Sequence, residues 1–297
     1  MPGVHDIVSI ESWLADVREY VSTKAPEVLP LLDVYLGEAR FGRQYVASDL
    51  TKLSRGASVL EVGAGSLLLS CQLVREGFRV TALEPICGGF SHFERLRELV
   101  LFRAELLGCL PKILDITVER LSENSCFDYA FSINVMEHVE NVALSISRVV
   151  SSLKLGASYR FTCPNYLFPY EPHFNIPTLF SKRFTERIFG NKILLEKNIP
   201  DPEGTWKSLN WINVIQINRI VKYLPELKIT FNRRHLVDTF ARIAFDNNFA
   251  MRRSKWLRVV VLLMVWLRLH YLVWCVPAMI QPIIDCVVKR TGVRGVL

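Results

Sequence analysis

The sequence predicts an α/β fold built on a doubly wound, mostly parallel sheet. Short apolar strands alternate along the chain with helices of amphipathic spacing, and the connections between them are short. Parallel neighbours need a crossover connection, so helices are expected on both faces of the sheet. The expected strands are residues 58–62, 79–83, 112–116, 127–133, 158–163 and 227–231, and the expected helices between them are 67–76, 90–107, 140–153 and 211–224.

A helical cap is expected before the first strand, over residues 1–55. Ser9 is a suitable N-cap and Pro26 ends the first helix, while a second helix begins near Pro30. The apolar residues of the first helix share one face, with the spacing of Ile10, Trp13, Leu14, Val17 and Val21. No confident seventh strand follows the sixth.

The most informative stretch is the strand 58–62 with the turn after it. Gly63 and Gly65, with Ala64 between them, allow a sharp turn before the next helix. A strand that ends in glycines and opens a helix is typical of an anion or nucleotide site, because helix N-terminal N–H groups bind anions and missing Cβ atoms let a ligand touch the backbone. The simpler alternative is a turn that binds no ligand.

The residues around this turn distinguish two kinds of nucleotide site. A dinucleotide site would need a third glycine at the position of Leu68. The chain instead has Glu61 before the glycines and Glu84 at the end of the next strand. This pattern resembles motif I and its partner in class I S-adenosylmethionine-dependent methyltransferases, whose fold is Rossmann-like. The resemblance implies that S-adenosyl-L-methionine is the cofactor and that Glu84 binds its ribose. It also implies that the residues in and before the turn belong to the cofactor site, namely Glu61, Gly63, Ala64 and Gly65.

The loop after the third strand flanks the adenine in this family. The resemblance assigns Val118 and Glu119 to that place, although Thr117 stands where an aspartate is usual. It also places Ser132 and Asn134, at the end of the fourth strand, beside the methionine part of the cofactor.

The fourth strand runs into Met136-Glu137-His138-Val139. This resembles the F-D strand and L-E-H-V signature of the group that includes enzymes of quinone and biotin-precursor methylation. Glu137 and His138 are then catalytic candidates at the mouth of the site. The alternative is that His138 only caps or packs the next helix.

A proline-rich loop over residues 164–177 begins at the carboxyl edge of the sheet, where open parallel sheets bind ligands. It resembles a subset of bacterial methyltransferases associated with glycan and other cell-envelope synthesis. His173 becomes a catalytic candidate, and Asn165, Tyr166 and Glu171 become candidates for acceptor binding. The alternative is that Glu171 and His173 only tie the loop to the body. We assign residues 56–235 to the methyltransferase domain, with residues 164–210 as the acceptor-side insertion.

The last expected segment, residues 250–292, is strongly apolar. Val259–Ile280 is long enough to cross a bilayer core of about 30 Å. Arg268 and His270 would then lie at its midpoint, where one Arg costs roughly 2.5–3.5 kcal/mol, and Pro277 interrupts a helix. We therefore expect a helical hairpin in the membrane interface, its second arm carrying a polar stripe of Gln281, Asp285 and Lys289. The alternative is a hairpin packed on the core or on a second subunit.

The composition limits the remaining possibilities. Lys and Arg number 36 and Asp and Glu 29, a net charge of +7 that is concentrated near the C-terminus, so no nucleic-acid partner is expected. Seven scattered cysteines without a C-x-x-C pair predict reduced thiols and no metal site. The N-terminus does not resemble a signal peptide. We expect a cytoplasmic protein that contacts the inner face of the membrane.

These features together predict a methyltransferase that acts on a hydroxyl or another nucleophile of a cell-envelope, glycan or lipid-linked acceptor. A hydroxyl acceptor would need a base, for which His138 or His173 is suited, whereas a carboxylate acceptor would need none. The alternatives are a soluble enzyme that methylates a small molecule and a catalytically silent module that only binds.

Overall fold

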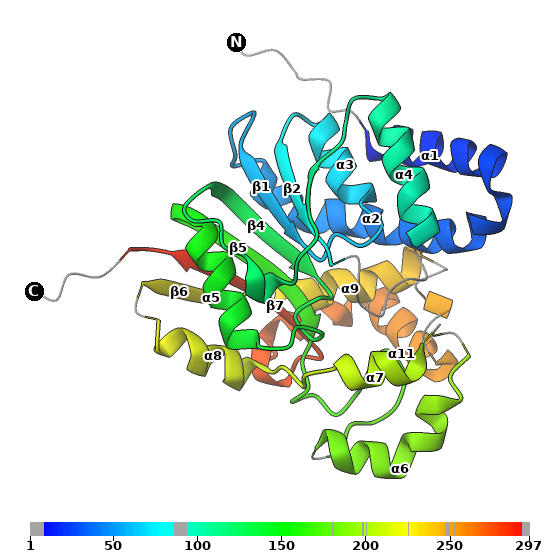
Figure 1. Cartoon of the computed structure of the whole chain (residues 1–297). Helices are drawn as coiled ribbons and strands as arrows, with labels where there is room; N and C mark the ends of the chain where they lie inside the picture. The colour runs from blue at the N-terminus through cyan, green and yellow to red at the C-terminus, as the bar shows by residue number, and fades with distance from the viewer. Residues whose placement is uncertain are drawn as a thin grey trace, which may run out of the picture. The chain divides into compact units, whose positions relative to one another are not determined.

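The computed structural model describes residues 9–85, 94–179, 181–197, 199, 201–224, 226–246, 250–251 and 254–292. Its central element is a seven-stranded sheet with the order β3-β2-β1-β4-β5-β7-β6 (Figure 1). β1, β2 and β3 pair in parallel, and β7 pairs antiparallel with both β5 and β6. The predicted fold class is confirmed.

Contacts divide the chain into two compact units. The first comprises residues 1–120 and 126–131, and the second comprises residues 121–125 and 132–297. β4 (Phe127–Ile133) contributes residues to both.

The first unit contains three parallel strands and the N-terminal helices. Trp13 is fully buried in its apolar core, and its indole N–H donates to the carbonyl of Leu68 at 2.9 Å, which ties α1 to α3. Its elements are α1 (Ile10–Lys24), η1 (Pro26–Val28), α2 (Leu29–Leu50), β1 (Ser58–Val62), α3 (Leu68–Arg75), β2 (Arg79–Leu83), α4 (Glu94–Leu106), β3 (Lys112–Leu114) and the 3₁₀ turn η3 (Val118–Arg120).

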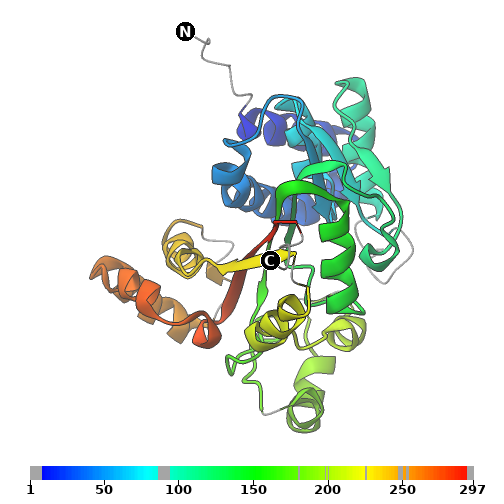
Figure 2. The same cartoon turned by 90° about the vertical axis from the view of Figure 1, so that its left-hand side faces the viewer.

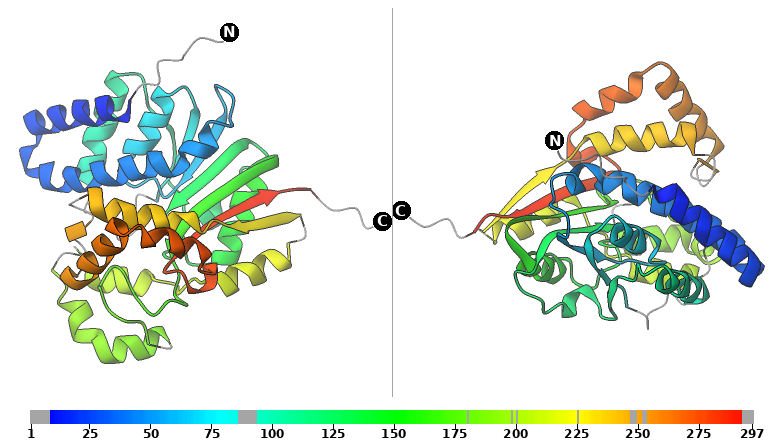
Figure 3. Two further views of the ribbon diagram at one scale, coloured as in Figure 1. Left: turned by 180° about the vertical axis from the view of Figure 1, so that it is seen from behind. Right: turned by 90° about the horizontal axis from the view of Figure 1, so that it is seen from above.

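The second unit carries the remaining strands and the C-terminal helices. α9 and α11 lie side by side, packed through Ile243, Ala250 and Val261 (Figure 3). Its elements are α5 (Val142–Ser152), β5 (Leu153–Pro164), α6 (Lys182–Leu194), α7 (Pro202–Ser208), α8 (Val214–Lys222), β6 (Leu227–Phe231), α9 (Arg234–Phe245), α11 (Lys255–Trp266), η4 (Leu269–Cys275), η5 (Ala278–Ile280) and β7 (Ile283–Arg290).

Most of the expected elements are present, and the glycine turn does follow β1. The helix expected over 90–107 is described from Glu94 onward, and its first four residues lie outside the described residues. The fifth strand, expected over 158–163, begins earlier, because α5 ends at Ser152 and β5 begins at once with Leu153.

The predicted second arm of the C-terminal hairpin is also wrong. Residues 283–290 form β7, the seventh strand that the sequence analysis did not find, between β5 and β6 (Figure 2). Ile284, Asp285 and Cys286 are all buried in succession, as expected for a strand covered on both faces. Asp285 is accommodated because Arg160 on β5 donates two hydrogen bonds to its carboxylate, at 3.0 and 2.7 Å.

The first arm is helical, as expected, over α11. Among the described helices, none alone has the length and apolar composition to cross a membrane. α11 and η4 meet those limits only when taken together, and the chain bends by 94° between them.

Candidate active site

The turn between β1 and α3 has left-handed backbone at Gly63 (φ 73°), Gly65 (φ 51°) and Leu67 (φ 65°). This conformation suits glycine, which has no Cβ to clash with the backbone. A Cβ added at Gly65 would meet no heavy atom within 4 Å. The backbone conformation, rather than a lack of space, therefore favours glycine at this position.

Glu84 follows β2 and contacts this turn. The N–H of Gly65 donates to Glu84 Oε2 at 3.0 Å, and the N–H of Gly63 donates to the carbonyl of Leu83 at 2.8 Å. The Glu84 carboxyl is buried, and burial raises its pKa, while the Gly65 hydrogen bond and the positive charge of Arg97 oppose that rise. The structure thus brings two predicted cofactor residues into direct contact.

Glu61, on β1, is also buried, and its carboxylate accepts a short hydrogen bond from the hydroxyl of Ser70 on α3. Burial raises the pKa of Glu61 to about 8, and the nearby charge of Glu84 adds to the rise. Glu61 is therefore mostly protonated at neutral pH. In the structure it joins the strand to the helix that follows the turn.

The remaining predicted cofactor residues belong to different units. Val118 is buried and Glu119 is half-buried in η3 of the first unit. Ser132 belongs to the second unit, where it is fully buried and its hydroxyl lies 2.7 Å from the hydroxyl of Tyr159. Asn134 is exposed with left-handed backbone (φ 54°), and its N–H donates to the carbonyl of Thr162 at 2.8 Å. Their cofactor contacts stay predictions.

In the second unit, the turn that carries Glu137 and His138 is fixed by Asn210. The amide side chain of Asn210 donates to the carbonyls of Met136 and Val139, both at 2.8 Å, and its backbone N–H donates to the carbonyl of Glu137 at 2.8 Å. The sequence analysis missed Asn210, because no motif marks it and its partners are distant in sequence.

His173 comes from the proline-rich loop and is oriented by Glu171. Its Nδ1 lies 2.6 Å from Oε1 of the fully buried Glu171, whose Oε2 accepts from the N–H of Phe174 at 2.7 Å. Tyr166 donates to Glu171 Oε1 at 3.3 Å. These hydrogen bonds of Glu171 lie within the loop itself and hold the imidazole of His173, and none of the three joins the loop to the body as the alternative interpretation expected.

Glu137, His138 and His173, the three predicted catalytic residues, come together. Their possible ligand atoms all lie within 4.8 Å of one another, and the two imidazole rings are 5.4 Å apart at 71°. Burial raises the pKa of Glu137 to about 7, although the positive charge of His173 opposes this rise. Burial and the charge of His173 lower the pKa of His138 to about 3, so His138 is neutral and a weak base.

Asn165, predicted to bind the acceptor, is fully buried and has a structural role that the sequence did not reveal. Its side-chain amide donates to the carbonyls of Met279 and Gln281 at 3.0 and 2.8 Å, and its N–H donates to the carbonyl of Pro282 at 2.9 Å. It therefore fastens the start of the loop to the chain before β7.

Aromatic side chains that the sequence analysis did not single out pack against the loop. Tyr166 stacks on Trp211 at 4.4 Å between ring centroids, and Trp206 lies edge-on to Trp211 and Phe174 at 5.5 and 5.7 Å. They give this side of the cluster an apolar wall.

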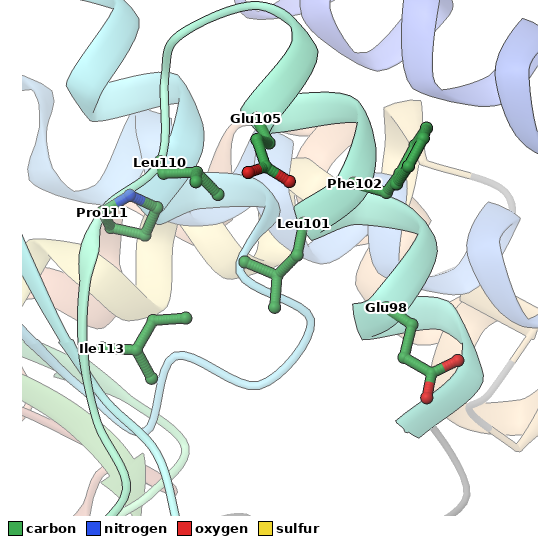
Figure 4. A pocket seen from close by; sticks show the side chains of 7 residues that line it. All are labelled: Glu98, Leu101, Phe102, Glu105, Leu110, Pro111 and Ile113. Atoms are coloured by element: carbon green, nitrogen blue, oxygen red, sulfur yellow. The ribbon is translucent and has the colours of Figure 1, made fainter.

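A separate surface pocket lies in the first unit between α4 and residues 110–113 (Figure 4). Leu101 of α4 and Ile113 of β3 extend into it, and Glu98 and Glu105 lie at its edge. None of the predicted site residues lines this pocket, so it is not part of the candidate active site.

Comparison with known proteins places the chain in a family. The uncharacterized protein Rv1509 of Mycobacterium tuberculosis (strain ATCC 25618 / H37Rv) is 45% identical over 276 residues, which cover 93% of each chain. The chain therefore belongs to the same protein family as Rv1509. No family model matches it.

More distant similarities are confined to part of the chain or to the structure. The ubiquinone biosynthesis O-methyltransferase of Rickettsia conorii is 30% identical over 138 residues, covering 46% of this chain and 41% of that enzyme. Among solved structures, an S-adenosylmethionine-dependent methyltransferase of Mesorhizobium loti has a TM-score of 0.49 and 14% identity, covering 81% of this chain and 94% of that one.

Proposed function

We propose that the protein is an S-adenosyl-L-methionine-dependent methyltransferase. The hydrogen bond from Gly65 to Glu84 carries this proposal, because it joins the ends of two neighbouring parallel strands. Backbone N–H groups and a buried carboxylate at that edge suit a ligand that offers both acceptors and ribose hydroxyls. The partial similarity to enzymes named ubiquinone biosynthesis O-methyltransferase agrees with it.

The turn would hold the cofactor through Glu61, Gly63, Ala64 and Gly65, with Glu84 on the ribose and Val118 and Glu119 beside the adenine. Ser132 and Asn134 would line the methionine part. When bound, the cofactor supplies a methyl group already activated by its sulfonium. The protein then contributes alignment and a site from which water is excluded.

The acceptor side of the proposal rests on the second unit. Glu137, His138 and His173 would bind the acceptor and deprotonate its hydroxyl, with Glu171 holding His173. Tyr166 and Asn165 would shape the loop around the acceptor. Neutral His138 is less suited than His173 to take a proton.

We further propose that the acceptor is lipid-linked or part of the cell envelope, because the second unit exposes a large apolar surface. This C-terminal apolar surface consists of exposed residues of α11, η4 and η5: Trp256, Val259, Leu263, Trp266, Tyr271, Leu272, Trp274, Met279 and Ile280. Trp266 alone is 78% exposed. Contiguous apolar surface of this kind is typical of an interaction site.

Charge favours an anionic lipid surface as the occupant. Lys255, Arg258 and Arg268 accompany the apolar residues, and the sequence contains no acidic residue between Asp246 and Asp285. Exposed Trp and Tyr side chains prefer the membrane interface, and basic residues near them are attracted to anionic lipid. A soluble enzyme with a small-molecule acceptor would have no use for this surface.

Replacing Glu84 tests the cofactor site. Glu84→Gln keeps the size of the side chain but removes the charged acceptor, and a hydrogen bond to a charged group contributes about 1.5–3 kcal/mol. We expect S-adenosylhomocysteine to bind the wild type in calorimetric titration and to bind this variant about 10- to 100-fold more weakly. Glu98→Gln, on the exposed face of α4, serves as the control. Equal affinity in Glu84→Gln would contradict the assignment.

Replacing His173 tests the acceptor side. His173→Asn should lower kcat by about 10²- to 10⁴-fold, the usual contribution of acid–base chemistry, while the affinity for S-adenosylhomocysteine is unchanged. His270→Asn, which removes an imidazole far from this cluster in sequence, should have the activity of the wild type. Full activity of His173→Asn would remove this residue from the mechanism.

Vesicle sedimentation tests the C-terminal apolar surface. The protein should sediment with phosphatidylglycerol vesicles at low salt and much less with phosphatidylcholine vesicles. Trp266→Glu combined with Trp274→Glu should weaken binding by at least about tenfold, because two aromatic side chains no longer leave water. Tyr223→Glu, an exposed aromatic at the end of α8, is the matched control. Wild-type protein that stays in the supernatant with both vesicles would refute a membrane role.

A further inference from the structure

The Glu137 carboxyl group is fully buried, and neither of its oxygen atoms has a hydrogen-bond partner among the described residues. Buried carboxylates are normally paired, hydrogen-bonded or bound to a metal ion. One oxygen of this carboxylate lies within 4.8 Å of a ring nitrogen of His138 and of His173.

Hydrogen bonds fix the tautomer of His138. The hydroxyl of Ser208 donates its proton to the carbonyl of Thr205 at 2.8 Å. The same oxygen lies 2.7 Å from Nδ1 of His138, so it accepts there and Nδ1 carries the hydrogen. In this tautomer Nε2 of His138 keeps its lone pair.

Glu171 fixes His173 in the same way. Both oxygens of Glu171 already accept hydrogen bonds, Oε1 from the Tyr166 hydroxyl and Oε2 from the N–H of Phe174, so Nδ1 of His173 donates to Oε1 at 2.6 Å. Metal-binding histidines commonly donate their other ring N–H to a carboxylate in this manner, which sets the ring orientation and makes the ligating nitrogen more basic. The hydrogen bonds thus leave Nε2 of each histidine as its electron-pair donor, and Glu137, His138 and His173 each offer one ligand atom within 4.8 Å of the others.

We propose that Glu137, His138 and His173 bind a divalent transition-metal ion through one carboxylate oxygen and the two Nε2 atoms. Two imidazoles and one carboxylate suit ions such as Zn²⁺, Co²⁺ and Fe²⁺. An ion about 2.1 Å from each ligand atom would hold the ligand atoms roughly 3–4 Å apart. In the structure these atoms lie within 4.8 Å of one another. Side-chain rotations are sufficient to close that difference.

Three protein ligands leave coordination positions open, as in catalytic metal sites. The catalytic role of this ion rests on the proposed methyltransferase function. An acceptor hydroxyl bound at an open position would lose its proton to solvent more readily. Its oxygen would then form the new O–CH₃ bond while the S–CH₃ bond breaks and S-adenosylhomocysteine leaves. In this account Glu137, His138 and His173 promote loss of the hydroxyl proton through the ion that they hold, so His173→Asn should still lower kcat. No cysteine takes part.

The test is titration of the metal-free full-length protein with Zn²⁺ by calorimetry and with Co²⁺ by visible absorption. Cys275→Ser is used as the background, because Cys275 is the exposed thiol among the described residues. We expect one ion per chain and a Co²⁺ spectrum without thiolate bands. Glu137→Gln should weaken binding at least about tenfold, and Glu171→Gln, which only orients His173, by about 10- to 100-fold.

Glu203→Gln, an exposed carboxylate on α7, is the matched control and should bind the ion as the background does. Circular dichroism and thermal melting establish that each variant is folded, and Zn²⁺ should raise the melting temperature of the background but not of Glu137→Gln. The inference is overturned if the folded background protein shows no saturable binding, or if Glu137→Gln binds equally well. S-adenosylhomocysteine is titrated into the same preparations. Metal binding then tests the metal site, and S-adenosylhomocysteine binding tests the methyltransferase proposal separately.

Discussion

The buried ion pair between Arg160 and Asp285 determines how the C-terminal part of the second unit is built. Both side chains are removed from solvent, and Asn232 adds a third hydrogen bond to the Asp285 carboxylate at 2.8 Å. A slip of β7 by one residue would turn Asp285 to the other face and leave Arg160 buried without its partner, at a cost of several kcal/mol. The register of β7 between β5 and β6 is therefore strongly specified.

That register connects two features of the second unit that are distant in sequence. With β7 in place, the residues just before it lie against Asn165, which donates to three carbonyls between residues 279 and 282. Asn165 is also the first residue after β5 and opens the loop that carries Glu171 and His173. The chain that leads from the C-terminal apolar surface is thus fastened to the proline-rich loop that carries Glu171 and His173. An enzyme that takes its acceptor from a membrane would benefit from this connection.

The elements that were predicted correctly are those whose signals are local. The glycine turn and the strand that leads to Glu84 each lie within a few residues of sequence, so spacing and resemblance were sufficient. β7 was missed because a strand buried on both faces has no alternation, and its polar residues also fit a helical spacing. Asn210 and Ser208 were missed because their function is to hold a turn far away in sequence. The structural use of Asn165 is visible only once β7 is placed.

Methyl transfer to a lipid-linked acceptor is the central claim, and the most direct measurement is transfer of label from methyl-tritiated S-adenosylmethionine. The protein is incubated with the cofactor and a membrane lipid extract, and the organic and aqueous phases are counted. The account predicts label in the organic phase, formed at the same rate as S-adenosylhomocysteine. Turnover that leaves all label on water-soluble products, or a protein that binds the cofactor without any turnover, would contradict it.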